Sequence, residues 1–180
     1  MKQLKTVLLL LMLIGLPLIS WYFLKSGLEW RKEKVSDLKA KELFMRSFDF
    51  SNADKDALYE MMAHRTAVVK LTDAINENDE KVIDQFDNAY TFQFISFEKT
   101  ENMSKGWNSK SVVRYFKPSS QNCTIAEMQG SKYMIVDTTG MIRQFYKDDS
   151  EKSLGTMIED LAVILPRKKA KDIVIKNQEQ

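Results

Sequence analysis

A run of nineteen uncharged residues near the N-terminus, from Thr6 to Leu24, constrains the architecture of this chain more than any other feature. At about 1.5 Å per residue, a helix of this length reaches about 28 Å, close to the hydrocarbon thickness of a bilayer. Trp21 and Tyr22 stand where interfacial aromatic residues are common. The alternative, a cleaved secretory signal, has a shorter apolar core and a small-residue cleavage site. We therefore expect residues 1–24 to be an uncleaved signal anchor.

Basic residues flank the apolar run on both sides, so a count of flanking charges leaves the membrane orientation open. They are Lys2 and Lys5 before the run, and Lys25, Arg31, Lys32 and Lys34 after it. A tail of only five residues before a long apolar run usually stays in the cytoplasm. We expect a single-pass protein of the inner (cytoplasmic) membrane of a bacterium, with its domain facing the periplasm.

The rest of the chain is electrically neutral and has the length of one domain. Two of the 27 basic residues precede residue 24, and the remaining 25 equal the number of acidic residues. Nucleic-acid binding needs a clustered basic excess, so we expect no nucleic-acid partner. We expect a charged connector over 25–44, a domain over 45–165, and a basic and polar tail over 166–180. The tail is either solvated or in contact with anionic lipid headgroups.

The segment Thr66–Asn78 is where an α/β domain would place its chemistry. Ala67–Leu71 has the pattern of a buried strand, and a helix follows whose cap is either Thr72 or Asn78. The carboxyl end of a strand and the positive end of a helix meet at this point, which is a common ligand site. The segment contains no cysteine, no histidine and no glycine-rich loop.

Acidic residues are concentrated in and after this segment. Their spacing lacks the glycine and the terminal glutamate of an EF-hand loop, so we expect them to form a solvated helix face rather than a calcium site. These residues are Asp73, Glu77, Asp79, Glu80, Asp84 and Asp87.

The remaining pattern predicts four strands and three helices around this segment. From Thr66 onward the order is β-α-β-α-β-β-α, in which two parallel strands with crossover helices precede a hairpin and a covering helix. This is the order of a thioredoxin-like fold. The predicted elements are a strand over Leu43–Phe50, a helix over Ala53–His64 capped by Asn52, a strand over Tyr90–Phe97, a helix over Ser109–Phe116, a hairpin with strands 132–137 and 141–146, and a helix from a Ser150 cap to Leu165.

The hairpin segment GSKYMIVDTTGMIRQFYK, residues 130–147, resembles the SCO/SenC family. Members of that family are membrane-anchored thioredoxin-fold proteins involved in copper delivery to cytochrome c oxidase. The resemblance covers roughly residues 45–165 and is clearest in the C-terminal half. It implies an α/β, thioredoxin-like domain with a mixed sheet and helices on both faces, behind an N-terminal transmembrane helix. The positions that fit the family hairpin are Ile135, Val136, Asp137, Gly140, Ile142, Arg143 and Tyr146.

The chain departs from the family at the positions that bind metal. The family turn Phe-Thr-x-Cys-x-x-x-Cys falls on residues 71–78, which places Ala74 and Asn78 at the two cysteine positions. The family's metal-binding histidine falls on Gln129. Because Cu(I) prefers thiolate and imidazole ligands, the resemblance implies a degenerate site, and we expect neither copper nor another cofactor.

The single cysteine and the single histidine are the weak candidates for chemistry. Cys123 has no second cysteine for an intramolecular disulfide or a CxxC pair, and a lone thiol is mostly a small buried hydrophobic group. His64 follows Met61 and Met62, but adjacent residues point apart on a helix, which disfavours a copper patch. We expect both to be structural.

These observations favour a membrane-tethered, non-catalytic binding or scaffold protein that contacts the membrane through residues 6–24 and binds an unidentified protein partner. The resemblance implies a role near the assembly of a respiratory complex, cytochrome oxidase. The alternative is an atypical copper chaperone or a thiol-based redox protein that uses Cys123 or methionine side chains.

Overall fold

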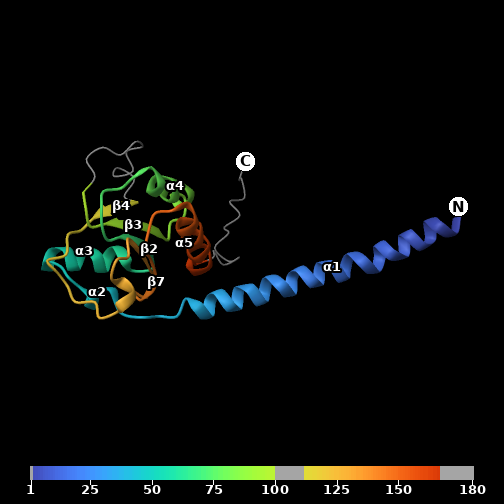
Figure 1. Cartoon of the computed structure of the whole chain (residues 1–180), viewed down its shortest axis with the longest axis horizontal. Coiled ribbons are helices and arrows are strands. Elements are labelled where there is room, and N and C mark those ends of the chain that lie inside the picture. The colour runs from blue at the N-terminus through green and yellow to red at the C-terminus, as the bar shows by residue number, and fades with distance from the viewer. Residues whose placement is uncertain (1, 100–111, 167–180) are drawn as a thin grey trace, which may run out of the picture. The chain divides into compact units, whose positions relative to one another are not determined.

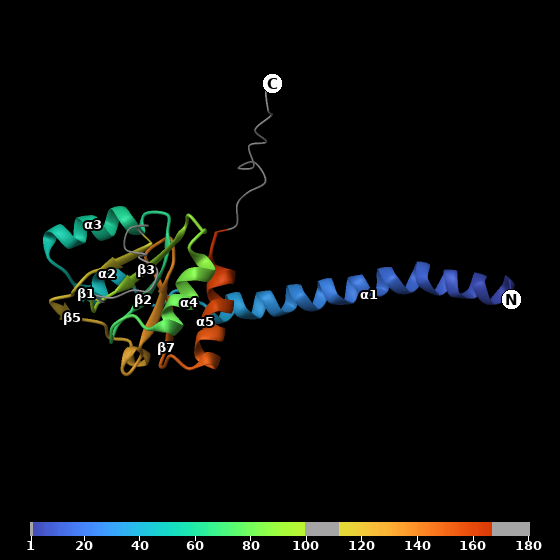
Figure 2. The same ribbon diagram turned by 90° about the horizontal axis from the view of Figure 1, so that it is seen from above.

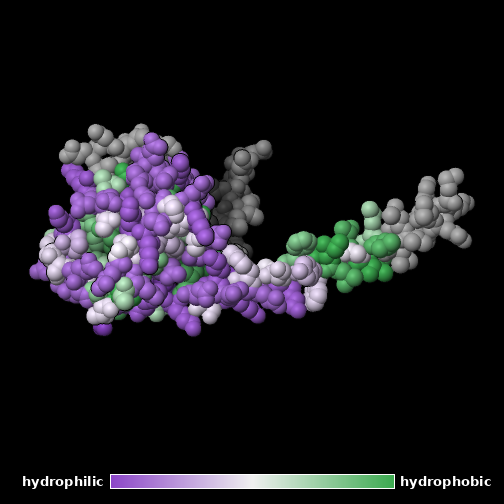
Figure 3. Space-filling model, in the orientation of Figure 1, coloured by the Kyte–Doolittle hydropathy of each residue, from purple (hydrophilic) through white to green (hydrophobic). Residues whose placement is uncertain are grey.

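The computed structural model describes residues 2–99 and 112–166, which fall into a helical unit ending at Leu38 and a domain beginning at Lys39. The first unit is one continuous helix, α1 (Lys2–Asp37), with Pro17 inside it. Its stretch from Leu11 is long and apolar enough to cross a membrane, judged by length and composition. Figure 3 shows apolar side chains gathered on this helix, whereas the visible surface of the domain is mostly hydrophilic.

The domain is built on a five-stranded mixed sheet with the order β4-β3-β2-β6-β7 (Figure 1). The central strand, β2, is parallel to β3, and β3 is parallel to β4. On the other side, β6 is antiparallel to β2 and forms a hairpin with β7. The strands are β2 (Thr66–Lys70), β3 (Phe92–Ser96), β4 (Val113–Tyr115), β6 (Tyr133–Val136) and β7 (Ile142–Tyr146).

Helices cover both faces of the sheet, so this unit is a mixed α/β domain. Figure 2 shows α3 (Asn52–Met62) on one side, and α4 (Glu77–Phe86) and α5 (Glu151–Ile164) on the other. Side chains alternate along a strand, so Val68 packs toward α4 and α5 while Val69 packs toward α3. All five residues of β2 are therefore buried.

The segment predicted as a strand over Leu43–Phe50 is instead a single helical turn, α2 (Phe44–Ser47), followed by the short strand β1 (Phe48–Asp49). The prediction of one strand was wrong because Phe44 and Phe48 are four residues apart, and one helical turn brings both rings into the same cluster. Their ring centroids lie 5.4 Å apart. The strand β1 pairs with β5 (Ser120–Gln121) in a separate two-stranded ribbon.

The helix predicted over Ser109–Phe116 is also wrong in its described part, since Val113–Tyr115 forms β4 and pairs in parallel with β3. Residues 109–111 lie outside the described residues. A short run containing Val112, Val113 and Tyr115 fits a strand as well as a helix, and the free edge of β3 decides between them. The sheet therefore has three parallel strands where two were expected.

The hairpin and the final helix are confirmed. The strands β6 and β7 flank Thr138-Thr139-Gly140, and Ser150 caps α5 by accepting a hydrogen bond from Ser153 N. The segment before the hairpin contains a short 3-10 helix, η2 (Ala126–Met128). Of the predicted tail over 166–180, only residue 166 is among the described residues.

Candidate functional site

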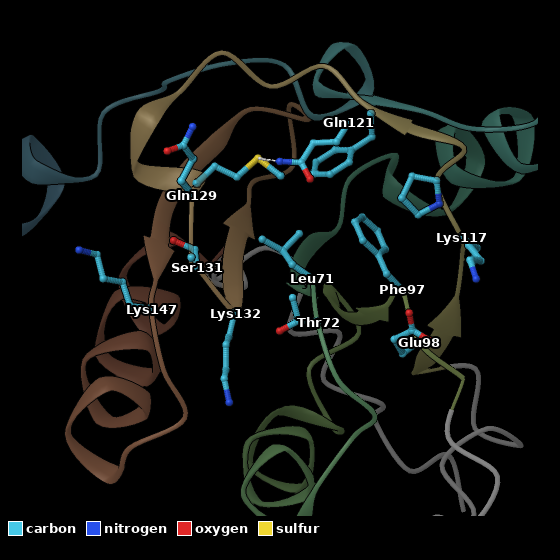
Figure 4. Close-up of a pocket in the computed structure, with 14 residues that line it drawn as sticks. Leu71, Thr72, Phe97, Glu98, Lys117, Gln121, Gln129, Ser131, Lys132 and Lys147 are labelled. Atoms are coloured by element: carbon cyan, nitrogen blue, oxygen red, sulfur yellow. Dashed lines mark hydrogen bonds between the residues drawn. The ribbon is translucent and has the colours of Figure 1, made fainter.

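A groove of about 480 Å³ lies at the edge of the sheet where β2 and β3 end and β6 begins (Figure 4). Parallel strands bring their carboxyl ends to one edge, and an antiparallel neighbour begins there. This placement puts Leu71, Phe97 and Lys132 at the groove, although they lie far apart in the sequence. The prediction that the carboxyl end of β2 holds a candidate site therefore leads to this groove.

The centre of the groove is apolar. Leu71 stands in the middle of the view in Figure 4, half-buried and beside Phe97. Met128 and Phe48 are buried along the same wall, and Gln121 donates a hydrogen bond to the Met128 sulfur at 3.5 Å.

Three lysines and one glutamate stand at the rim of the groove. Lys132 contacts Asp149 at 3.4 Å and Asp73 at 3.5 Å, and hydrogen bonding to Asp149 raises the pKa of the lysine. Lys117 and Lys147 form no ion pair with any residue that the structure describes. Lys132 is already paired with two acids, so the positive charge available at the rim is that of Lys117 and Lys147, opposed by Glu98 among the described lining residues.

The turn between β2 and α4 is fixed by a capping box. The Asn76 side chain accepts hydrogen bonds from Asn78 N at 3.0 Å and Asp79 N at 3.1 Å, and the Asp79 carboxylate accepts one from Asn76 N at 2.8 Å. The cap predicted at Thr72 or Asn78 is therefore wrong. Thr72 lies at the groove, and only Asn76 has Asp79 three residues later to complete the box.

A buried polar network lies directly beneath this turn. The Lys70 ammonium forms an ion pair with Asp79 Oδ2 and donates a hydrogen bond to the carbonyl oxygen of Ala74 at 2.9 Å. Tyr133 donates its hydroxyl hydrogen to Asp79 Oδ1 at 2.6 Å, and the Lys70 ammonium lies 5.4 Å from the centre of the Tyr133 ring. Burial, followed by this hydrogen bond to Asp79, raises the pKa of Tyr133.

This network corrects the expectation of a wholly solvated acidic helix face. Asp79 is 0% exposed, whereas Asp73 and Glu77 are exposed as predicted. The third position of a helix can point inward, and here the partners Lys70 and Tyr133 satisfy the buried carboxylate.

The three positions that the resemblance aligns with metal ligands are divided between the groove and its surroundings. Gln129 is exposed at the groove, together with Leu71 and Thr72. Ala74 and Asn78 do not line it. Ala74 accepts the hydrogen bond from Lys70, and Asn78 donates its side-chain amide to the Asp149 carbonyl at 3.4 Å.

The two weak candidates for chemistry also lie outside the groove lining. Cys123 is half-buried against the α3-side core, with its sulfur 3.5 Å from a Glu42 carboxylate oxygen. Burial raises the pKa of this thiol, and the nearby carboxylate raises it further. His64 is exposed between α3 and β2 with a φ of 67°, at the amino end of the strand whose carboxyl end forms the groove.

The residues that carry the hairpin resemblance have structural contacts. Asp137 accepts hydrogen bonds from Thr139 N at 2.8 Å and Met141 N at 3.0 Å and pairs with Arg143, which closes the turn. Gly140 supplies the positive φ, 78°, that this turn requires. Ala67 pairs with Val136, so the turn lies at the sheet end opposite the groove.

Tyr146, the last of the hairpin positions, is buried under α5. Its hydroxyl donates a hydrogen bond to Asp160 Oδ2 at 2.8 Å. Burial, with the Asp160 charge next, raises the pKa of this tyrosine. These hairpin residues, Asp137, Gly140, Arg143 and Tyr146, thus shape the fold rather than the groove.

Comparison with models of known protein families gives no match, and no curated protein matches the chain at a significant level. The candidate site is therefore judged on its geometry. Within residues 2–99 and 112–166, no group of three or more histidine, cysteine, aspartate or glutamate side chains is arranged to hold a metal ion. The groove instead offers apolar contact and positive charge.

Sequence reasoning did not identify Lys70, Asp79 and Tyr133 as a unit, nor Lys117 and Lys147 as neighbours of one groove. One signal was available for Lys70, because it lies two residues after Val68 in a buried strand and shares its face. No pattern of neighbouring residues in the sequence indicates that Lys117 and Lys147 lie at the same groove.

Proposed function

We propose that this chain is a membrane-tethered, non-catalytic binding protein with a thioredoxin-like domain. The strand order β3-β2-β6-β7, with one parallel and two antiparallel pairings, supports that fold, as do the crossover helix α4 and the covering helix α5. The apolar part of α1 supports attachment to a membrane.

The observation that carries the proposal is the groove itself. It lies at the carboxyl end of β2, beside the turn that the resemblance aligns with the family's cysteine motif, and it presents apolar and cationic side chains. Among the described residues of this lining, the Ser131 hydroxyl donates to the Glu127 carbonyl at 2.6 Å and the Thr72 hydroxyl lies a long 3.5 Å from Asp73, which favours binding over nucleophilic chemistry. The groove is the place where we expect a protein partner to bind.

The location and the process follow from the resemblance and the N-terminal helix together. We propose a single-pass protein of the inner membrane with the domain in the periplasm. The resemblance of the hairpin to the SCO/SenC family extends the proposal to the assembly of a respiratory complex, cytochrome oxidase. This step rests on family analogy, since fold alone does not define function.

The alternative, a copper chaperone or thiol redox protein using Cys123 or methionine, has less support. Cys123 lies outside the groove lining, and its raised pKa lowers the fraction of reactive thiolate at neutral pH. Met128 is buried, and its sulfur already accepts a hydrogen bond from Gln121.

Site-specific photocrosslinking in the cells that make the protein tests the proposal. A photoreactive phenylalanine derivative replaces Gln129 at the groove or, as a matched control, Tyr59, which is 63% exposed on α3. We expect a discrete crosslinked protein from position 129 and a different or empty pattern from position 59. Identical patterns at both positions, or no product at position 129, would contradict a binding role for the groove.

A further inference from the structure

We infer that the groove binds an extended acidic peptide segment, in which acidic residues flank one apolar side chain on both sides. This inference rests on the proposed function and names the chemistry of the partner. It follows from the apolar centre of the groove, the positive charge of its rim and the distance between its two ends.

The apolar centre can hold one side chain of the partner. Leu71 is only half-buried in the free domain, and buried aromatic rings stand beside it. An apolar side chain that packed on Leu71 beside Phe97 would bury its own surface and the exposed part of Leu71, which favours association. A purely charged ligand would contact the rim but leave this apolar centre uncovered.

The rim lysines give the charge of the partner. Lys132 is neutralised by Asp149 and Asp73, which leaves Lys117 and Lys147, at the two ends of the groove, without an acidic partner among the described residues. Figure 4 shows the lysine side chains around the apolar centre rather than over it. Carboxylates on either side of the apolar residue would therefore meet ammonium groups, which complements the charges of the two surfaces.

The span of the rim gives the length of the partner. Lys117 follows β4 and Lys147 follows β7, and these are the two edge strands of the five-stranded sheet. Neighbouring strands lie about 4.8 Å apart, so the strand ends that carry the two lysines are separated by about 19 Å. An extended chain of about six residues covers this distance at about 3.3 Å per residue.

Fluorescence anisotropy with the full chain in nanodiscs of neutral lipid tests the inference. The probe is a labelled peptide of about seven residues, with a central leucine between acidic residues. We expect binding that weakens at least tenfold when glycine replaces the leucine, and binding below detection when lysines replace the acids. Equal binding of all three peptides would overturn the inference.

Charge variants tie the binding to this groove. The double substitution Lys117→Glu with Lys147→Glu should weaken binding of the acidic peptide at least tenfold. Lys55→Glu with Lys152→Glu, a matched change on α3 and α5, should leave it unchanged. The same loss in both variants would overturn the inference, as would an unchanged affinity in the first.

Two other occupants are tested alongside the peptide. Vesicles containing phosphatidylglycerol that displace the peptide at lipid concentrations where neutral vesicles do not would identify a lipid site and overturn the inference. A concentration-dependent dimer that is lost in the Lys117→Glu, Lys147→Glu variant would also overturn the inference, because the groove would then bind a second copy of the chain. If the acidic peptide does not bind while position 129 still crosslinks to a protein, the inferred acidic character of the partner is wrong and the binding role of the groove stands. If both fail, the proposed function fails as well.

Discussion

Lys70 of β2 and Asp79 of α4 form an ion pair inside the domain, with only 1% and 0% of their side chains exposed. The pair joins the central strand to the helix that begins at the candidate site, and it supports the turn at Ala74 through the Lys70 ammonium. Removing two charges from water is costly, so each partner depends on the other and on Tyr133. The carboxyl end of β2 is thus held by electrostatics as well as by packing.

Breaking this pair should destabilise the domain strongly. We expect Lys70→Met or Asp79→Asn to lower the free energy of unfolding by about 3–5 kcal/mol, because each leaves a buried group without its charged partner. Urea titration of the detergent-solubilised chain, followed by near-ultraviolet circular dichroism, measures the change. Lys152→Met, an exposed position on α5, is the matched control and should shift stability by less than about 0.5 kcal/mol.

The double variant separates the pair from its single groups. Lys70→Met with Asp79→Asn should cost less than the sum of the two single substitutions, because neither charge is then left buried alone. Strictly additive losses would show that the two side chains contribute independently.

Asp137 should make the hairpin sensitive to acid. Burial by itself would raise the pKa of this carboxyl, but hydrogen bonds from Thr139, Met141 and Arg143 outweigh burial and hold its pKa below the usual value. A lowered folded-state pKa stabilises the protein above the unfolded-state value, about 3.9, and this stability is lost as the pH falls through the folded-state pKa. Asp137→Asn should lower stability at pH 7 by about 1.5–3 kcal/mol.

The pH profile tests the cause of that loss. The difference in unfolding free energy between the native chain and the Asp137→Asn variant should be constant near neutral pH and shrink as the pH falls below about 4. A difference that stayed constant throughout the acid range would rule out the charge of Asp137 as its source.

Two glycines should respond to alanine in opposite directions. Gly140 has a φ of 78°, so Gly140→Ala should cost about 1–2 kcal/mol through backbone strain, although the nearest side-chain atom lies 3.9 Å from an added Cβ. Gly155 lies inside α5 with nothing within 4 Å of an added Cβ, so Gly155→Ala should stabilise by about 0.5–1 kcal/mol. Thermal unfolding of the two variants beside the native chain measures both effects, and the same sign for both would contradict this explanation.

Cys123 should be a slow thiol. Burial and the Glu42 carboxylate raise its pKa, so the thiolate is scarce at neutral pH. Alkylation by iodoacetamide at pH 7.5 should run several-fold slower in the native chain than in the urea-unfolded chain. Cys123→Ser, which should not react, defines the background. A native rate equal to the unfolded rate would show that the fold does not suppress the thiolate.

Local pattern was sufficient for several elements. The hairpin follows from two β-rich runs around Gly140, and α5 follows from its Ser150 cap and helical spacing of leucines. These features depend on short-range sterics and hydrogen bonds that the neighbouring residues alone supply. The strand β2 was also predicted, because its run of apolar residues is typical of a buried strand, although β3 and β6 supply its hydrogen bonds.

Local pattern failed where a distant segment decided the conformation. Val113–Tyr115 is a strand because the edge of β3 pairs with it. The helical turn Phe44–Ser47 lies between two distant contacts, a bridge from Leu43 to Met141 and the packing of the Phe48 ring on Phe97. In both places the residues fit more than one element, and tertiary contact selected one of them.

The sequence by itself determined the apolar N-terminal stretch and the hairpin turn, and it places no cysteine or histidine at positions 74, 78 and 129. Only the tertiary structure decided that Asp79 is buried beside Lys70, and that Lys117 and Lys147 stand at one groove. The physical reason is the range of the interactions. Turn geometry and helix caps act within a few residues, whereas burial and the shape of a groove depend on which distant segments the sheet brings together.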